Sequence, residues 1–304
     1  MTARLANPMP ARADAFVAAC ALDVAAFKPG NVSQESPGHG MRAEDFLVSA
    51  EVAAPFLCAP GRPVGERIYL AVAATRAAVA CNTNLGILLL TAPLLLAAET
   101  GRPGASLATR LRGVLADLSL ADADWAFRAI ALAAPGGLGH AEAHDVHAAA
   151  DVTLLAAMQA AAARDRIAHQ YATGFRDVFE IGLPALSAGR RRWRDDSRAL
   201  VAVYLAFLAA FPDSHVARKR GEDTAERVRR QAAECLAATR AAVDWAAVRP
   251  GLADLDRRLK ADGINPGTSA DLCVATWLAD RLGAAPAHPD NRSGPVPERP
   301  ETPV

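Results

Sequence analysis

The chain has 304 residues, of which 52% are hydrophobic and 22% are charged, so it is long enough to bury a substantial core. Its 33 lysines and arginines balance 33 aspartates and glutamates, which argues against a general nucleic-acid binder or a protein drawn to anionic lipid. Aromatic residues make up only 5%, and long alternating runs of β-branched residues are missing, which disfavours an all-β fold. The abundance of alanine favours helices instead.

No segment predicts secretion or membrane insertion. The five cysteines are scattered and form no C-x-x-C pair, which argues against a disulfide framework and a zinc ribbon. The first ten residues lack the apolar stretch of a signal peptide. Residues 85–98 are strongly apolar, but Pro93 interrupts them and they fall short of the roughly 18 residues that a bilayer crossing needs. We therefore expect a soluble, reduced, cytoplasmic protein with no membrane partner.

Apolar residues at helical spacing predict a series of helices. The first is expected over residues 12–27, because Phe16, Cys20 and Val24 recur about one turn apart. Residues 28–31 end it, since a proline disfavours helical geometry at the residue before it. Further helices are expected from about residue 43 and over residues 65–80, 85–98, 106–118, 122–133, 145–173, 196–211, 223–248, 252–261 and 268–283. The arginines of residues 190–194 fall between these helices.

The pattern predicts one compact all-α domain over residues 12–283. Residues 1–11 are expected to be a flexible N-terminus, and residues 284–304, rich in proline and polar side chains, a disordered tail. Polar loops alternate with the apolar helices, at residues 28–31, 82–84, 135–139, 213–219 and 265–271. We expect the helices to form a single body whose loops gather into a cleft.

Residues 265–271, Asn-Pro-Gly-Thr-Ser-Ala-Asp, are the most informative local sequence. Thr268 or Ser269 can cap the following helix, and Asp271 in the first turn complements its dipole. Alternatively, the exposed amides and hydroxyls after a glycine bind phosphate. Asp271 would then hold a metal ion against the phosphates.

Two other polar segments have the same two interpretations. Asn82, Thr83 and Asn84 precede a very apolar helix; Asn84 could cap it, but three such side chains exceed what a cap needs, so we favour a ligand contact. Residues 213–215, Asp-Ser-His, cannot form a catalytic triad, because adjacent residues do not reach one another in a relay. His215, Arg218 and Lys219 form either a solvated basic turn or a cationic loop that meets phosphates.

Residues 135–147 and the helix after them carry further candidates. Three histidines within residues 140–147 suggest a metal site by composition, but the H-E-x-x-H arrangement is absent. Asp145 is either a helix N-cap or a positioned carboxylate. Asp165 and His169 are four residues apart and share one face of the predicted helix, which either is solvated or lines the cleft. Residues 135–139 lack the P-loop pattern, and no dinucleotide-binding glycine motif follows a strand.

These segments together resemble the triphosphoribosyl-dephospho-CoA synthase family, two of them being closer to a divergent branch of it. Each block is weak alone, but their order between residues 23 and 282 is specific. The blocks are Lys28-Pro29-Gly30-Asn31-Val32-Ser33, Glu44-Asp45-Phe46-Leu47 with Ser49-Ala50, Asn82-Thr83-Asn84-Leu85-Gly86, Pro135-Gly136-Gly137-Leu138-Gly139 with Asp145-Val146, Arg164-Asp165 with Gln170-Tyr171, Asp213-Ser214-His215 with Arg218-Lys219, and Asn265-Pro266-Gly267-Thr268-Ser269-Ala270-Asp271.

The resemblance implies an all-helical enzyme that moves the triphosphoribosyl group of ATP onto the ribose 2′-hydroxyl of 3′-dephospho-CoA and releases adenine. ATP use implies Mg²⁺. Positive charge would develop at the anomeric carbon, so a carboxylate base would activate the hydroxyl while an acid assists the leaving group. Two alternatives stay open: an ATP-dependent transferase with another nucleotide-like acceptor, for instance in the biosynthesis of a one-carbon carrier cofactor, and a non-catalytic nucleotide-binding protein. A homodimer also stays open.

The same resemblance implies roles for particular residues. Asp45, Asp165 and Asp271 are the candidate catalytic residues, and Asp145, Asp165 and Asp271 the candidate metal ligands. The residues expected to bind nucleotide are Lys28, Asn31, Ser33, Asn82, Thr83, Asn84, His215, Arg218, Lys219, Asn265 and Ser269.

Overall fold

The computed structural model describes residues 9–100, 105–141 and 143–284, and within them it contains helices and no β-strand, so the all-α prediction is confirmed. The helices are α1 (Met9–Ala25), α2 (Ala43–Leu57), α3 (Val64–Val79), α4 (Leu85–Glu99), α5 (Leu107–Ala116), α6 (Leu120–Ala133), α7 (Leu154–Ala161), α8 (Arg166–Thr173), the π-helical turn η1 (Val178–Gly182), α9 (Leu183–Trp193), α10 (Asp196–Ala210), α11 (Ser214–Arg220), α12 (Glu222–Ala241), α13 (Trp245–Ala261) and α14 (Gly267–Gly283).

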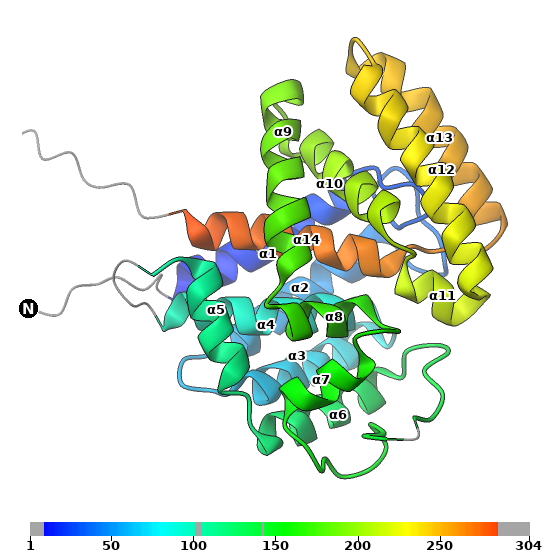
Figure 1. Cartoon of the computed structure of the whole chain (residues 1–304). Coiled ribbons are helices and arrows are strands. Elements are labelled where there is room, and N and C mark those ends of the chain that lie inside the picture. The colour runs from blue at the N-terminus through cyan, green and yellow to red at the C-terminus, as the bar shows by residue number, and fades with distance from the viewer. Residues whose placement is uncertain (1–8, 101–104, 142, 285–304) are drawn as a thin grey trace, which may run out of the picture.

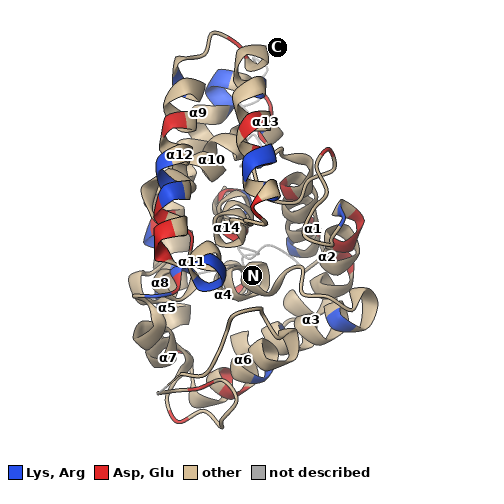
Figure 2. Ribbon diagram, turned by 90° about the vertical axis from the view of Figure 1, so that its right-hand side faces the viewer, with Lys and Arg blue, Asp and Glu red and all other residues tan. Residues whose placement is uncertain are grey.

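Helices α4 and α14 form the centre of the molecule, and they pack against each other. Helix α4 is apolar on all sides, and Leu88, Leu90 and Leu94 have no exposed surface. Burying each leucine contributes roughly 1.5–3 kcal/mol relative to leaving it in water, so the sequence of this helix, which carries no charge before Glu99 at its end, places it in the core. Helix α14 crosses the middle of the molecule and is seen end-on in Figure 2, with charged residues on the surrounding helices.

The polar helices lie outside this core. Helices α12 and α13 pack side by side at one end of the molecule, and α6 and α7 lie at the other (Figure 1). Within the described residues no single helix is long and apolar enough to cross a membrane, although α10 and α11, bent by 55°, pass the length and composition test as a pair.

The prediction of one helix over residues 145–173 is wrong. Residues 145–153 form a loop, and α7 and α8 follow as two separate short helices. The Thr153 hydroxyl caps α7 by accepting a hydrogen bond from the backbone of Ala156, and the Asp165 carboxylate caps α8. An alanine-rich sequence fits one long helix or two short ones, so the capping side chains decide where helices begin.

Other helix boundaries also differ from the predictions. Asp213 caps α11, which turns a predicted loop into a helix carrying Arg218 and Lys219. Asp244 caps α13, which therefore begins before the predicted break and runs through Pro250. Residues 190–193 belong to α9, and α1 begins at Met9, within the predicted flexible segment. The remainder of that segment and the predicted tail beyond residue 284 lie outside the described residues.

Candidate active site

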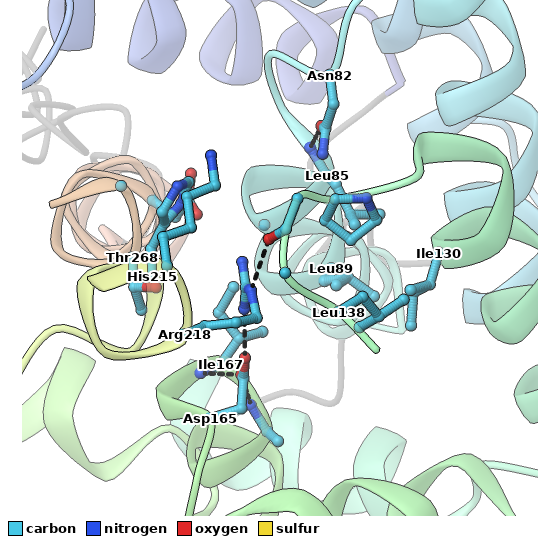
Figure 3. A pocket seen from close by; sticks show the side chains of 18 of the residues that line it. Asn82, Leu85, Leu89, Ile130, Leu138, Asp165, Ile167, His215, Arg218 and Thr268 are labelled. Atoms are coloured by element: carbon cyan, nitrogen blue, oxygen red, sulfur yellow. Dashed lines mark hydrogen bonds and ion pairs between the residues drawn. The ribbon is translucent and has the colours of Figure 1, made fainter. Parts of the chain in front are cut away.

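A cavity of about 920 Å³ lies where the loops between the helices meet. Its wall combines an apolar side, including Leu85, Leu89 and Ile130, with a polar side that contains His215 and Arg218 (Figure 3). The predicted site residues that line it are Asn31, Asn82, Thr83, Asn84, Asp145, Asp165, His215, Arg218, Lys219, Asn265 and Asp271. The structure thus brings together side chains that are up to 240 positions apart in the sequence, from Asn31 to Asp271.

The loop after α1 reaches the cavity because α13 and α14 hold it. Gly30 has a φ of +80°, and a Cβ there would lie 2.9 Å from Leu259 Cδ1, so the position requires glycine. Its backbone N–H donates a 2.8 Å hydrogen bond to Asp256 Oδ1. Asn31 then donates a 2.8 Å hydrogen bond from Nδ2 to Oδ1 of Asn265, which places both amides at the cavity wall.

The segment before α4 contributes a second group of amides. The Asn82 side chain accepts a 3.2 Å hydrogen bond from the backbone N–H of Leu85 and so caps this helix (Figure 3). Asn84 makes no capping bond; its Nδ2 donates to Thr75 Oγ1 at 3.2 Å. The prediction that Asn84 could cap the helix is therefore wrong, and Asn84 lines the cavity instead.

Asp165 and Arg218 connect the start of α8, helix α11 and the loop after α6 at the cavity. Asp165 Oδ1 accepts backbone hydrogen bonds from Ile167 (2.9 Å) and Ala168 (3.0 Å), and its Oδ2 lies 3.5 Å from Arg218 Nη1. Arg218 Nε also donates to the carbonyl of Gly136 at 3.3 Å, as Figure 3 shows. Asp165 is the N-cap of α8 and not part of one long helix, and it lines the cavity, whereas His169 is not among the lining residues.

Asp271 lies one turn into α14, which has no acidic residue in its first turn, so the prediction that it complements the helix dipole from there is wrong; its carboxyl group faces the first turn of α4 instead. A Cβ at Gly86 would collide with Asp271 Oδ2 and would lie 2.8 Å from Ile167 Cδ1. Only a glycine at position 86 leaves room for this carboxyl group, so the Asn-Leu-Gly sequence at the start of α4 has a steric role as well as a polar one.

Negative charge is concentrated around Asp271. Removal from water raises the pKa of its carboxyl group well above the ordinary value, and the neighbouring carboxylates Asp23, Asp213 and Asp165 raise it further. The positive charge of Arg218 acts in the opposite direction. Asp271 is therefore the group on which an added cation in the cavity would have a large effect.

The cationic side of the cavity is formed by α11. Loss of water contact lowers the pKa of His215 to about 3, and the charges of Lys219 and Arg218 act in the same direction, so its imidazole is neutral at physiological pH. The buried Nε2 of His215 has no hydrogen-bond partner among the described residues. Partial desolvation and the neighbouring Arg218 and Arg220 also lower the pKa of Lys219. Cations are thus crowded at the cavity rim, where an anion would relieve their repulsion.

Asp145 lies in a loop and not at the start of a helix. Its predicted interpretation as a helix N-cap is therefore wrong, and the alternative, a positioned carboxylate, remains. Its carboxylate accepts backbone hydrogen bonds from Ala141 (2.9 Å) and His147 (2.8 Å), and these bonds hold its pKa well below the ordinary range. The Nδ1 atoms of His140 and His147 lie 3.1 and 2.8 Å from its oxygens. The ligand atoms of these two histidines and Asp145 all lie within 4.8 Å of one another, which is close enough for a metal ion.

Four predicted site residues do not line the cavity. Lys28 is buried in an ion pair with Asp23, and Ser33 is also buried. Asp45 caps α2 by accepting a 2.8 Å hydrogen bond from the backbone of Arg42. Ser269 donates from both its backbone and its hydroxyl to Asp213 Oδ2, each at 2.8 Å.

The predicted caps of α14 are absent. Neither Thr268 nor Ser269 caps this helix, which has no side-chain cap hydrogen bond. Thr268 instead shares a 3.0 Å hydrogen bond with Ser214, while Ser269 binds Asp213. Both hydroxyls therefore fasten α14 to α11, a contact that no local sequence pattern predicts.

Asp23 is a cavity residue that sequence reasoning missed. It lies in the last turns of α1 and is only 2% exposed. The sequence does carry a signal: Asp23 is a charged residue beside the inward-facing positions Cys20 and Val24, about one turn before the Lys28-Pro29 segment. Charged residues are rarely buried unless they are paired or functional, so this position warranted a site assignment.

Comparisons with known proteins agree with this architecture. The family described as CitG, ATP:dephospho-CoA triphosphoribosyl transferase, matches residues 9–289. A 2-(5''-triphosphoribosyl)-3'-dephosphocoenzyme-A synthase of Pectobacterium atrosepticum is 36% identical over 107 residues, which are 35% of this chain and 33% of that protein. A relative of the same description from Pectobacterium carotovorum subsp. carotovorum is 34% identical over 107 residues, again 35% of this chain and 33% of the relative. The aligned part thus spans about a third of these curated relatives.

The fold comparison covers more of the chain. A crystal structure from Archaeoglobus fulgidus, described as a triphosphoribosyl-dephospho-CoA synthase, superposes with a TM-score of 0.61 at 27% sequence identity. The superposition covers 78% of this chain and 98% of that one. The family match over residues 9–289 includes every helix described here, and the chain therefore belongs to the CitG family.

Proposed function

We propose that this protein transfers the triphosphoribosyl group of ATP to the 2′-hydroxyl of 3′-dephospho-CoA and releases adenine. The family and the relatives support this reaction by the names they carry. The observation that carries the proposal is the cavity, in which carboxylates, amides, guanidinium and ammonium groups from six separate loops or helix ends surround one space. A reaction between two phosphorylated nucleotides needs such a mixed lining.

The cationic rim fits the triphosphate. Arg218 offers a planar guanidinium for paired hydrogen bonds to phosphate oxygens, and Lys219 supplies a mobile positive charge beside it. The amides of Asn82, Asn84 and Asn31 can donate and accept hydrogen bonds at the edge of a base or a ribose. The apolar side of the cavity would cover the face of an adenine ring.

The carboxylates fit Mg²⁺, which prefers oxygen ligands and is usually held by one or two carboxylates together with substrate phosphates. We propose Asp165 and Asp271 as its ligands, because a divalent cation would offset the repulsion that raises the pKa of Asp271. Asp145 is the third proposed ligand, from the loop after α6. When bound, Mg²⁺ would neutralise part of the triphosphate charge.

The remaining chemistry is a substitution at the anomeric carbon. As the bond to adenine breaks, positive charge develops on the ribose, and a cavity lined with carboxylates stabilises that charge. The neutral imidazole of His215, with its unpartnered Nε2, can hydrogen-bond a ring nitrogen or a hydroxyl without repelling the developing cation. Enclosure by the loops limits the access of water, which would otherwise compete with the acceptor hydroxyl.

The direct test is to incubate the protein with ATP, Mg²⁺ and dephospho-CoA and to measure free adenine and the mass of the product. Asp271→Asn and Lys219→Ala should lower adenine release strongly, whereas a change at Arg227, an exposed arginine paired with Asp262 outside the cavity lining, should not: Arg227→Met is the control. A product of a different mass would indicate another acceptor. Saturable ATP binding without adenine release would indicate a non-catalytic nucleotide-binding protein and would refute the proposal, as would unchanged turnover in both variants.

A further inference from the structure

Asp23 is the most buried carboxylate that lines the cavity, at 2% exposure. Among the described residues no group donates a hydrogen bond of normal geometry to its buried Oδ1. Lys28 Nζ lies 3.0 Å from this oxygen, as an ion pair, and is itself held by a hydrogen bond to the backbone carbonyl of Asp23. A buried carboxylate that lines a cavity, with one cation beside it and no hydrogen bond of normal geometry to Oδ1 among the described residues, requires an explanation.

The burial of this pair carries an energetic cost. Taking a carboxylate and an ammonium out of water costs several kcal/mol per ion after relaxation, on the order of what their attraction returns. A pair of apolar residues of similar volume would fill the same space between α1 and the following loop without that cost. The position therefore retains a charge for a reason other than stability, and the cavity lies on its open side.

We propose that Asp23 is the base that accepts the proton of the attacking hydroxyl, and that Lys28 is a positioning residue that holds its carboxylate. This inference rests on the proposed function. In the step, a carboxylate oxygen of Asp23 takes the hydroxyl proton while the hydroxyl oxygen bonds to the anomeric carbon. The bond from that carbon to adenine N9 breaks, and its electron pair leaves with adenine. Adenine takes a proton from solvent, and Asp23 returns its own to solvent, so protons balance.

The other carboxylates of the cavity fit this role less well. One carboxylate oxygen of Asp165 accepts two backbone hydrogen bonds, and the other pairs with Arg218. Asp145 accepts two backbone bonds and contacts two histidine rings. Burial and three neighbouring carboxylates raise the pKa of Asp271 well above its ordinary value although Arg218 opposes the rise, which favours its protonated form in the absence of a cation. Asp23 accepts no hydrogen bond of normal geometry at Oδ1 among the described residues, and the neighbouring Lys28 favours its ionised form.

Lys28 is the positively charged group beside Asp23. The negative charge of Asp23 acts on Cys20 of α1, on Tyr204 of α10, and on Cys273 and Asp271 of α14. None of these four groups is cationic. Burial raises the pKa of Asp23, and Lys28 opposes the rise. A carboxylate that burial makes more basic, beside an ammonium group that favours its ionised form, has the properties of a general base.

The test compares wild type with Asp23→Asn, Lys28→Met and the double variant Asp23→Asn/Lys28→Met. The double variant removes both buried charges at once, so we expect it to fold even if an unpaired lysine destabilises the single variant. Adenine release, ATP affinity by calorimetry and thermal stability are measured for each. Loss of a general base should lower kcat by about 10²–10⁴-fold in Asp23→Asn and in the double variant, with ATP affinity unchanged.

Lys28→Met gives the readout for positioning. Without the ammonium group the pKa of Asp23 rises further, so the acidic limb of the rate profile moves to higher pH while activity at high pH approaches that of wild type. A purely structural lysine would lower the rate equally at every pH. A Lys28→Met profile that keeps the wild-type acidic limb therefore contradicts the positioning role.

Three results would overturn the assignment of Asp23. They are a folded double variant with wild-type turnover, a loss of ATP affinity that accounts for the lost rate, and recovery of Asp23→Asn at higher Mg²⁺, which would make Asp23 a metal ligand. Each of these leaves adenine release by the wild type intact, so the proposed function would stand. Absence of adenine release by the wild type itself would instead remove the proposed function and this inference together.

Discussion

Asp165 and Asp271 line the same cavity but are held in opposite ways. The carboxylate of Asp165 caps α8 with two backbone hydrogen bonds and lies 3.5 Å from Arg218, whereas Asp271 faces Gly86 and makes no hydrogen bond or ion pair with the described residues. The carboxylate of Asp165 therefore stabilises the fold through its hydrogen bonds, whereas the carboxyl group of Asp271 makes no such bond with the described residues. This difference predicts opposite effects of the same substitution on stability.

Asp271→Asn should raise the free energy of unfolding near neutral pH while it abolishes adenine release. Because the pKa of Asp271 is raised in the folded state, the neutral form is favoured there. The associated stability is complete below the unfolded pKa of about 4 and is lost as pH rises toward the folded pKa. The advantage of the variant over wild type should therefore grow from pH 4 to pH 8 in urea unfolding without Mg²⁺.

Asp165→Asn is the matched control. It keeps the size of the side chain but weakens the charge-assisted cap of α8 and the contact with Arg218, so it should cost about 1 kcal/mol at pH 7. If both variants destabilise the protein equally at every pH, the contrast between the two carboxylates is wrong.

His215 predicts a sensitivity to acid. Since loss of water contact lowers its pKa to about 3, folding excludes the proton that the unfolded histidine binds below its ordinary pKa. The corresponding stability is present above pH 6.5 and is lost as pH falls toward 3. Between pH 7 and pH 4.5 this amounts to about 2–3 kcal/mol, which His215→Gln should recover. Urea unfolding at both pH values measures the free energy of unfolding of wild type and variant. An equal loss of this free energy in both proteins on going from pH 7 to pH 4.5 would contradict the prediction.

Much of the fold could be predicted, because the apolar periodicity of helices such as α4 and α14 reflects burial directly. The loop of residues 145–153 could not be predicted, because an alanine-rich sequence is compatible with helix throughout. The capping residues Thr153 and Asp165 determine where α7 and α8 begin. Asp213 shows a second limit: it binds Ser269 56 positions away, and no local pattern specifies such a contact.

For the candidate site, polar segments before helices predicted cavity residues well, because helix starts leave backbone and side-chain groups free to meet a ligand. Asn82 and Asn265 are examples. Lys28 stood in an equally suggestive segment but turned inward to Asp23, because the chain direction after α1 is set by contacts of Gly30 with α13. Side-chain direction in an irregular loop depends on distant packing that one sequence does not display.

Lys219→Met should weaken ATP binding by about tenfold, because one charged contact to phosphate contributes on the order of 1.5 kcal/mol. Its position at the cavity rim beside Arg218 favours an effect on affinity more than on the chemical step. Calorimetric titration with ATP, in low and in high salt, measures the loss, and the difference from wild type should shrink as salt screens the exposed ammonium group. Arg227→Met, outside the cavity, should bind ATP like wild type.

Gly86→Ala tests the contact between α4 and α14. The added Cβ would collide with Asp271 and crowd Ile167, so the carboxyl group must move within the cavity. A shift of about 1 Å at a reacting group can cost up to about 10²-fold in rate, and overpacking costs about 1–3 kcal/mol in stability. Gly113→Ala in α5 is the matched control, because a Cβ there meets nothing within 4 Å and should stabilise the helix by about 0.5–1 kcal/mol. Adenine release unchanged in Gly86→Ala but lowered in Gly113→Ala would show that the position of Asp271 does not govern the reaction.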